Sequence, residues 1–164
     1  MIKYYERIIK REIRKTKKFR KNNIVRIVGI KSNTYDFSMN IIKKISEKYS
    51  LNLKIDENVY KNLGDLELKE DSILIIPLEG VFLSYIIYKT ENIDRFYLIF
   101  KKYKPLNICY RVSEFVLSKY LNKKPYKIDE KYFKIIEFMY KIFEKNEKYA
   151  IAVGKFLDYI EKYY

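Results

Sequence analysis

Residues 24–37, IVRIVGIKSNTYDF, decide the fold. The first seven residues are mostly β-branched and predict a buried strand. The polar residues from Ser32 to Asp36 include several good helix N-caps, and apolar residues at helical spacing then predict a helix that ends near Tyr49. Residues 51–55 alternate apolar and polar side chains, which predicts a second strand. A strand–helix–strand unit requires a right-handed crossover and a parallel sheet.

The rest of the chain adds one strand and several helices. We expect a basic amphipathic helix at 2–20, a loop or short helix at 56–72, a strand at 72–77, a helix from Val81, helices capped by Ser113 and Asp129, and a final helix at 147–163. The expected fold class is therefore α/β, with a Rossmann-like parallel sheet that is reduced in size and a helical C-terminal part. One compact unit is expected, comprising a basic N-terminal helix (1–22), an α/β part (23–110) and C-terminal helices (111–164).

Composition excludes several classes of enzyme. The 164 residues contain no histidine and one cysteine. This rules out a Ser-His-Asp triad, His-ligated metals, an internal disulfide and any zinc or iron–sulfur site built from several thiolates, so no metal site is expected. Only four Gly and three Pro are present, which argues against a barrel or sandwich of many short strands.

Positive charge is concentrated in two segments of a chain whose formal net charge is +14. Residues 1–26 hold eleven Lys and Arg against two Glu, and residues 99–128 hold eight against one Glu. Two separated basic segments favour contact with nucleic acid. The side chains expected to contact RNA phosphates are Lys10, Arg11, Arg14, Lys15, Lys17, Lys18, Arg20, Lys21, Lys101, Lys102, Lys104, Arg111, Lys123 and Lys124.

A basic helix on a membrane surface is the rival interpretation of this charge. The apolar stripe of the N-terminal helix is only modest, and no stretch reaches the roughly 20 apolar residues of a membrane span. We therefore expect no membrane partner. The sequence shows no signal peptide and no disulfide pattern, which predicts a cytoplasmic location.

A strand followed by a polar turn and a helix N-terminus can bind phosphate, because free amides and the helix dipole meet there. With the basic helix before it, this order resembles the start of the PP-loop ATP pyrophosphatases, the adenine-nucleotide α-hydrolase-like (HUP) superfamily. Their Ser-Gly-Gly-Lys-Asp-Ser motif falls on residues 32–37, where it matches Ser32 and Asp36. A register three or four residues earlier instead matches Gly29 and Lys31. The resemblance implies a PP-loop type of fold and nucleotide-binding residues among these four.

More of the chain is similar to one branch of that superfamily, the enzymes that 2-thiolate uridine in tRNA. That branch carries Ile-Lys-Pro-Leu, then a glutamate and a tyrosine-bearing helix, and this chain has Tyr-Lys-Pro-Leu at 103–106 followed by Glu114 and Tyr120. The branch then has Cys-Pro-Tyr and a helical tail, and this chain has Lys-Pro-Tyr at 124–126. The order of segments matches from about residue 5 to 160.

Side chains that the family's chemistry needs are missing. Asn33 and Thr34 stand where the motif has two glycines, and Tyr35 stands where it has lysine. Lys124 replaces the cysteine before Pro-Tyr, and the single thiol, Cys109, is expected to be buried and structural. Sulfur transfer needs an activated pair of thiolates or a cluster held by about three cysteines. The chain is therefore not expected to thiolate tRNA on its own.

Three functions remain open. The leading hypothesis is a non-catalytic, degenerate relative of the tRNA-thiolation enzymes that binds tRNA or braces a catalytic paralogue, without a cofactor. The second is a residual tRNA-modifying enzyme that binds ATP and magnesium at Ser32 and Asp36, although a helix cap and a first-turn acid explain both residues without a ligand. The third is a structural interaction protein that uses Tyr163–Tyr164 or residues 132–143 as its contact surface.

Overall fold

A small parallel sheet lies at the centre of the N-terminal half of the protein. The computed structural model describes residues 1–163, apart from the side chain of Glu161. Strands β1 (Ile24–Ile30), β2 (Lys54–Tyr60) and β3 (Ile73–Ile75) are all parallel and lie in the order β2-β1-β3. Helix α2 (Asn33–Lys48) connects β1 to β2. The parallel strand–helix–strand unit expected from the sequence is confirmed, and the protein is an α/β protein with a three-stranded sheet.

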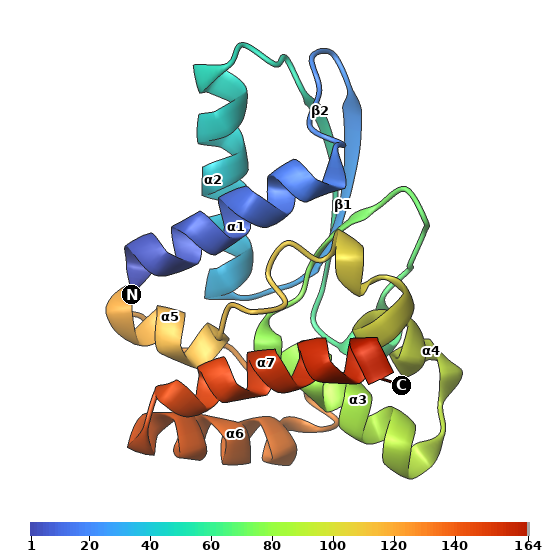
Figure 1. The fold of residues 1–164 in the computed structure, drawn as a ribbon, viewed down its shortest axis with the longest axis vertical. Helices are drawn as coiled ribbons and strands as arrows, with labels where there is room; N and C mark the ends of the chain where they lie inside the picture. The colour runs from blue at the N-terminus through green and yellow to red at the C-terminus, as the bar shows by residue number, and fades with distance from the viewer. Residues whose placement is uncertain (164) are drawn as a thin grey trace.

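Helices make up most of the remaining chain. They are α1 (Ile2–Thr16), α3 (Leu78–Glu91), α4 (Asp94–Tyr97), a π-helix η2 (Leu98–Lys102), α5 (Glu114–Tyr120), α6 (Phe133–Lys145) and α7 (Lys148–Tyr163), with short 3₁₀ turns η1 (Leu63–Asp65) and η3 (Lys104–Leu106). In Figure 1 the sheet and α2 occupy the upper half of the molecule, and α3, α5, α6 and α7 gather in the lower half. The carboxyl ends of the strands point toward these lower helices.

Several elements differ in extent from the sequence expectation, among them α1 and β2. Helix α1 ends at Thr16 rather than near residue 20, because Lys17 adopts a left-handed backbone with φ of 56°. Strand β2 runs from Lys54 to Tyr60, so it leaves out the first three residues of the strand expected at 51–55 and continues through part of the stretch expected to be a loop. Its backbone pairs with β1 along its whole length, and as an edge strand it leaves acidic side chains in solvent.

The structure confirms the predicted helix cap at Ser113 and gives Asp129 a different role. Ser113 Oγ accepts a hydrogen bond from Val116 N at 3.1 Å and caps α5. The Asp129 carboxylate lies a turn before α6 and accepts from Tyr132 N at 3.1 Å and from Leu63 N at 2.9 Å. It therefore fixes the turn that leads into α6 instead of capping the first residue of the helix.

Gly29 allows α2 to pack closely against the sheet. A Cβ atom at this position would lie 2.5 Å from Cδ2 of the Tyr35 ring and 2.9 Å from the backbone oxygen of Ile75. The Tyr35 hydroxyl in turn donates to Glu57 Oε1 on β2 at 2.8 Å. Packing of the aromatic ring thus accounts for the glycine in β1.

Replacing Gly29 with alanine should destabilise the protein, because neither the buried ring nor the backbone oxygen can move away cheaply. We expect Gly29→Ala to lower the free energy of unfolding in urea by about 1–3 kcal/mol. Gly64→Ala is the matched control, since an added Cβ there meets nothing within 4 Å. Equal stability of the two variants would contradict this packing role.

Candidate functional site

Ser32 lies where β1 ends and α2 begins, at the edge of the sheet where parallel α/β proteins bind their ligands. Its Oγ accepts a hydrogen bond from Tyr35 N at 3.0 Å and donates one to the Ile30 oxygen at 2.9 Å. Asp36 is exposed in the first turn of the same helix. Ser32 therefore acts as a helix cap, as the ligand-free interpretation of the sequence predicted.

A carboxylate of the chain itself binds the amides at the start of α2. The side chain of Glu114, the first residue of α5, is 0% exposed. Glu114 Oε1 accepts from Asn33 N at 3.0 Å, and Oε2 accepts from Thr34 N at 2.9 Å and from Thr34 Oγ1 at 2.8 Å. Ser118 Oγ and Tyr126 N also donate to Oε1. An anion bound at this helix end would need the same two amides, and Glu114 already accepts from both.

A second buried carboxylate, Glu79, binds the start of α5 in the same way. Glu79 lies in the first turn of α3 and accepts from Ser113 Oγ at 2.6 Å, from Glu114 N at 2.9 Å and from Phe115 N at 3.2 Å. We call Glu79 and Glu114 the capping pair. Glu79 lies in the first turn of α3 and caps α5, and Glu114 lies in the first turn of α5 and caps α2. The pair therefore connects α3 to α5 and α5 to α2.

The capping pair is stabilised by dipoles and hydrogen bonds from neutral donors. The positive ends of α2, α3 and α5 converge on the two carboxylates, which favours negative charge there. Burial nevertheless raises the pKa of the Glu79 carboxyl to about 7, against the opposing effect of the hydrogen bonds from Ser113, Glu114 and Phe115. Removing these carboxylates would leave buried donors without acceptors.

Lysines surround a cavity of ≈ 700 Å³ that is also lined by Asn33 and Tyr126, two of the residues that donate to Glu114. Lys31 follows β1 and Lys61 follows β2, while the loop after α5 contributes Lys123, Lys124 and Lys127. This loop is fixed in place by the same buried network, because Tyr126 N donates to Glu114 and Asn33 Nδ2 donates to the Lys124 oxygen at 3.0 Å. Asp36 and Glu130 are the carboxylates on its wall, so positive charge prevails in the cavity.

A second basic surface lies between α1 and α2. A groove of ≈ 810 Å³ is lined on the α1 side by Lys10, Arg14, Lys17 and Arg20, and on the α2 side by lysines that include Lys44. We call it the α1–α2 groove. Four of the residues expected to contact RNA are thus gathered around one groove.

Other expected RNA contacts lie on α1 or close to it. Arg11 and Lys15 are exposed and both pair with Glu12, at 3.1 Å. Lys21 is exposed and Lys18 is half-buried in the segment after α1. The N-terminal basic segment therefore places most of its cations at the surface.

Lys104 is a correction to the expected RNA-contacting set, and Arg111 pairs with the same carboxylate as Lys104. Lys104 is 2% exposed, and its Nζ lies 3.4 Å from Asp158 Oδ1 and 3.4 Å from the Leu157 oxygen. Arg111 is half-buried, and its Nη2 also pairs with Asp158. Tyr110 Oη donates to the same carboxylate at 3.0 Å. Both cations hold α7 against the rest of the fold, and burial removes Lys104 from the surface on which RNA contacts were expected.

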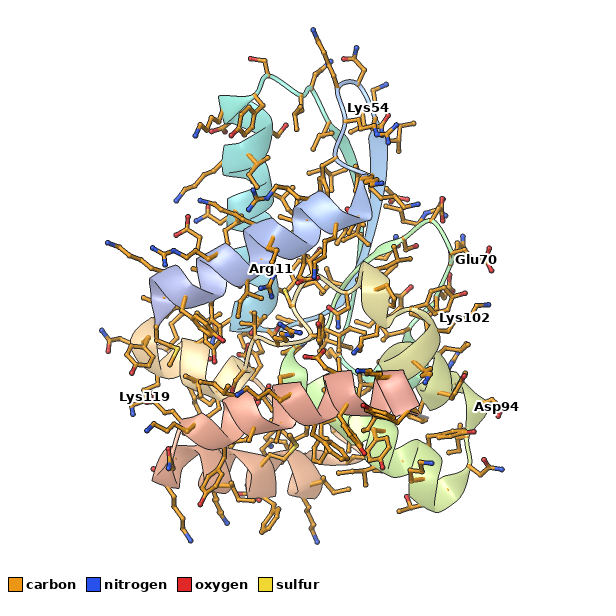
Figure 2. The ribbon with its side chains drawn as sticks, in the orientation of Figure 1. Arg11, Lys54, Glu70, Asp94, Lys102 and Lys119 are labelled. Carbon is orange, nitrogen blue, oxygen red and sulfur yellow. The ribbon has the colours of Figure 1, made fainter. Side chains whose placement is uncertain are left out.

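Lys101 and Lys102 lie apart from the α1–α2 groove. Lys101 is half-buried, and Lys102 Nζ lies 3.4 Å from Glu70 Oε1. In Figure 2, Lys102 and Glu70 lie together at the right edge of the molecule, whereas Arg11 lies on α1. Lys101 and Lys102 therefore do not line the α1–α2 groove.

The single thiol has a structural role, as the sequence predicted. Cys109 is fully buried, and its Sγ lies 2.8 Å from Ser38 Oγ. Burial raises the pKa of this thiol to about 12, which keeps it protonated at neutral pH. Within the described residues, no group of three or more His, Cys, Asp and Glu side chains is placed to hold a metal ion.

Comparison of the chain with protein-family models, with curated proteins and with solved structures finds no match. None of the helices formed by the described residues combines the length and hydropathy that crossing a membrane requires.

Sequence reasoning missed the capping role of Glu79 and Glu114 and the cations contributed by Lys44, Lys48, Lys61 and Lys127. Glu79 could have been noticed, because it is the one charged residue in the apolar run from Ile73 to Leu83. A charge in such a run must find partners inside the protein. The additional lysines carry no sequence signal of their own, since exposed lysines occur along the whole chain.

Replacing the Glu114 carboxylate with an amide should cost more stability than any surface change of the same kind. In Glu114→Gln the new NH₂ group would face donors, so we expect the free energy of unfolding to fall by about 3 kcal/mol. Glu137→Gln, at an exposed position of α6, should change it by less than about 0.5 kcal/mol. Urea unfolding of both variants measures the difference, and near-equal values would rule out the capping role.

Stability should decrease as the pH rises from 5 to 7. The pKa of Glu79 is about 7 in the folded protein and 4.5 is its ordinary value, so the folded state binds this proton more tightly. The free energy of unfolding, measured in urea, should therefore be about 2 kcal/mol lower at pH 7 than at pH 5. The chain has no histidine, so no imidazole adds to the slope of the free energy of unfolding against pH. Glu79→Gln should remove most of the slope, and an unchanged slope would contradict the assignment.

Proposed function

We propose that this protein is a non-catalytic tRNA-binding protein, a reduced and degenerate relative of the tRNA 2-thiolation enzymes with a HUP or PP-loop type of fold. It would present tRNA to, or brace, a catalytic paralogue in the cytoplasm. The observation that carries the proposal is the contact of the Glu114 carboxylate with the amides of Asn33 and Thr34. It supports a scaffold that retained its shape while its phosphate position became part of its own core.

ATP does not fit the strand–helix junction of this chain. The two amides that would bind a phosphate are already satisfied, and a phosphate beside the buried Glu114 carboxylate would meet like charge. The Tyr35 side chain packs over Gly29 and donates to Glu57, so it supplies no cation where the family has lysine. We therefore propose that the protein acts without ATP.

The charge distribution supports a polyanionic partner. The α1–α2 groove and the lysine-lined cavity both combine several exposed cations with few carboxylates. Arg14 and Arg20 add planar forks that suit phosphate oxygens. RNA supplies one phosphate for each nucleotide, so a groove lined by several cations can neutralise several charges at once.

A catalytic paralogue remains the proposed protein partner. Helix α7 exposes Tyr149, Phe156, Tyr159 and Tyr163 at spacings of seven, three and four residues, and the rings of Tyr159 and Tyr163 lie 4.5 Å apart. Such a stripe of exposed rings is suited to a protein contact. Tyr163 belongs to the contact surface considered under the third hypothesis, together with Tyr164, which lies outside the described residues.

Binding of tRNA should depend steeply on salt. In filter binding, affinity should fall by about 10²- to 10³-fold between 50 and 200 mM monovalent salt, because bound phosphates release counterions. Changing Lys10, Arg14, Lys17 and Arg20 together to Gln should weaken binding by at least about tenfold and lower the slope of log K against log salt by about 3.

The matched control changes Lys131, Lys134, Lys141 and Lys145 to Gln. These four lysines are exposed before and along α6, so both variants lose the same formal charge. The control should retain most of the affinity and slope of the unmodified protein. A flat response of the unmodified protein to salt would remove the proposed function, and equal losses in the two variants would remove the assignment of the surface.

A further inference from the structure

The α1–α2 groove combines an apolar floor with a cationic rim. Ile13 and Ile41 are buried at its base, and Phe19 and Phe37 are half-buried beside them. Tyr49, at the end of α2, is 62% exposed on the same groove. The groove thus presents aromatic side chains from two different segments of the chain to whatever enters it.

Charge on the rim is strongly one-sided. Among the lining side chains that the structure describes, six are cationic and Glu6 is the one carboxylate. Glu6 is already paired with Lys10 across one turn of α1. Lys10, Arg14 and Lys17 follow one another about one turn apart along one wall, so the cations run along the groove. An occupant must therefore carry several negative charges in a row and also bury apolar surface.

We propose that the α1–α2 groove binds unpaired nucleotides of RNA, with phosphates on the basic rim and bases stacked on Phe37 and Tyr49. The proposal rests on the proposed function and specifies which part of an RNA this surface takes. Proteins that bind single strands combine a positive groove with aromatic side chains on which bases stack. A duplex offers the rim its phosphates but keeps its bases stacked inside, so it cannot use the rings.

An acidic helix of a protein partner is the rival occupant. A helix would place its apolar side chains on the floor, but its acidic residues would have to match cations on both walls. Lys44 and Lys48 line the groove from α2, opposite the α1 cations. A flexible single strand carries a charge at every nucleotide and can follow both walls, which favours RNA.

The test compares single-stranded and duplex RNA by fluorescence anisotropy on the full chain. The probes are a labelled ten-nucleotide oligouridine and a ten-base-pair duplex carrying the same label. We expect Tyr49→Leu to weaken binding of the oligouridine by about tenfold, because stacking is lost while the apolar character is kept. Duplex binding should change by less than about twofold. Tyr159→Leu, an exposed tyrosine on α7, is the control and should change neither.

Phe37→Leu provides a second variant with the same expectation, and circular dichroism checks that each variant folds. Equal affinity of Tyr49→Leu and the unmodified protein for oligouridine would overturn the stacking inference, even if tRNA still binds with a steep salt response. Displacement of oligouridine by polyglutamate at matched charge concentration would also overturn it, in favour of an acidic protein partner. If neither tRNA nor oligouridine binds, the proposed function fails and this inference fails with it.

Discussion

The contact between the Glu114 carboxylate and the start of α2 is the interaction on which the rest of the structure depends. Five donors from α2, α5 and the following loop meet at one buried side chain, and Glu79 fixes the helix that carries it. The pair therefore connects the sheet, through α2, to the helices below it in Figure 1. A buried carboxylate is costly unless every oxygen is satisfied, so the surrounding backbone is tightly constrained.

The same contact occupies the amides at the start of α2, where the topology of the fold suggests a ligand site. Parallel sheets bind ligands where their strands end, and helix N-termini there attract anions. In this protein those N-termini are neutralised from within, and the remaining positive charge lies outside, around the lysine-lined cavity and the α1–α2 groove. The buried network also positions the lysine loop through Tyr126 and Lys124. The core thus positions a surface lined by cations, while Glu114 already binds the amides at the start of α2.

Much of the fold could be predicted from local patterns, but the capping pair could not. The run from Ile24 to Ile30 and the caps at Ser32 and Ser113 are local signals, and the structure confirms them. Glu114 meets Asn33 across 81 residues, and counting charges along the chain cannot show that Asp158 removes Lys104 from the surface. Strand β2 was partly missed because an exposed edge strand needs no strict alternation.

The most direct test follows the amide signals of Asn33 and Thr34 by NMR while magnesium ATP is added to the full chain. If Glu114 holds these amides, both signals stay at their positions, and both amide protons exchange slowly with solvent before and after the addition. Saturable movement of the two signals with ATP, together with changes at Glu114, would show that a nucleotide displaces the carboxylate. That result would contradict the account and restore an active nucleotide site.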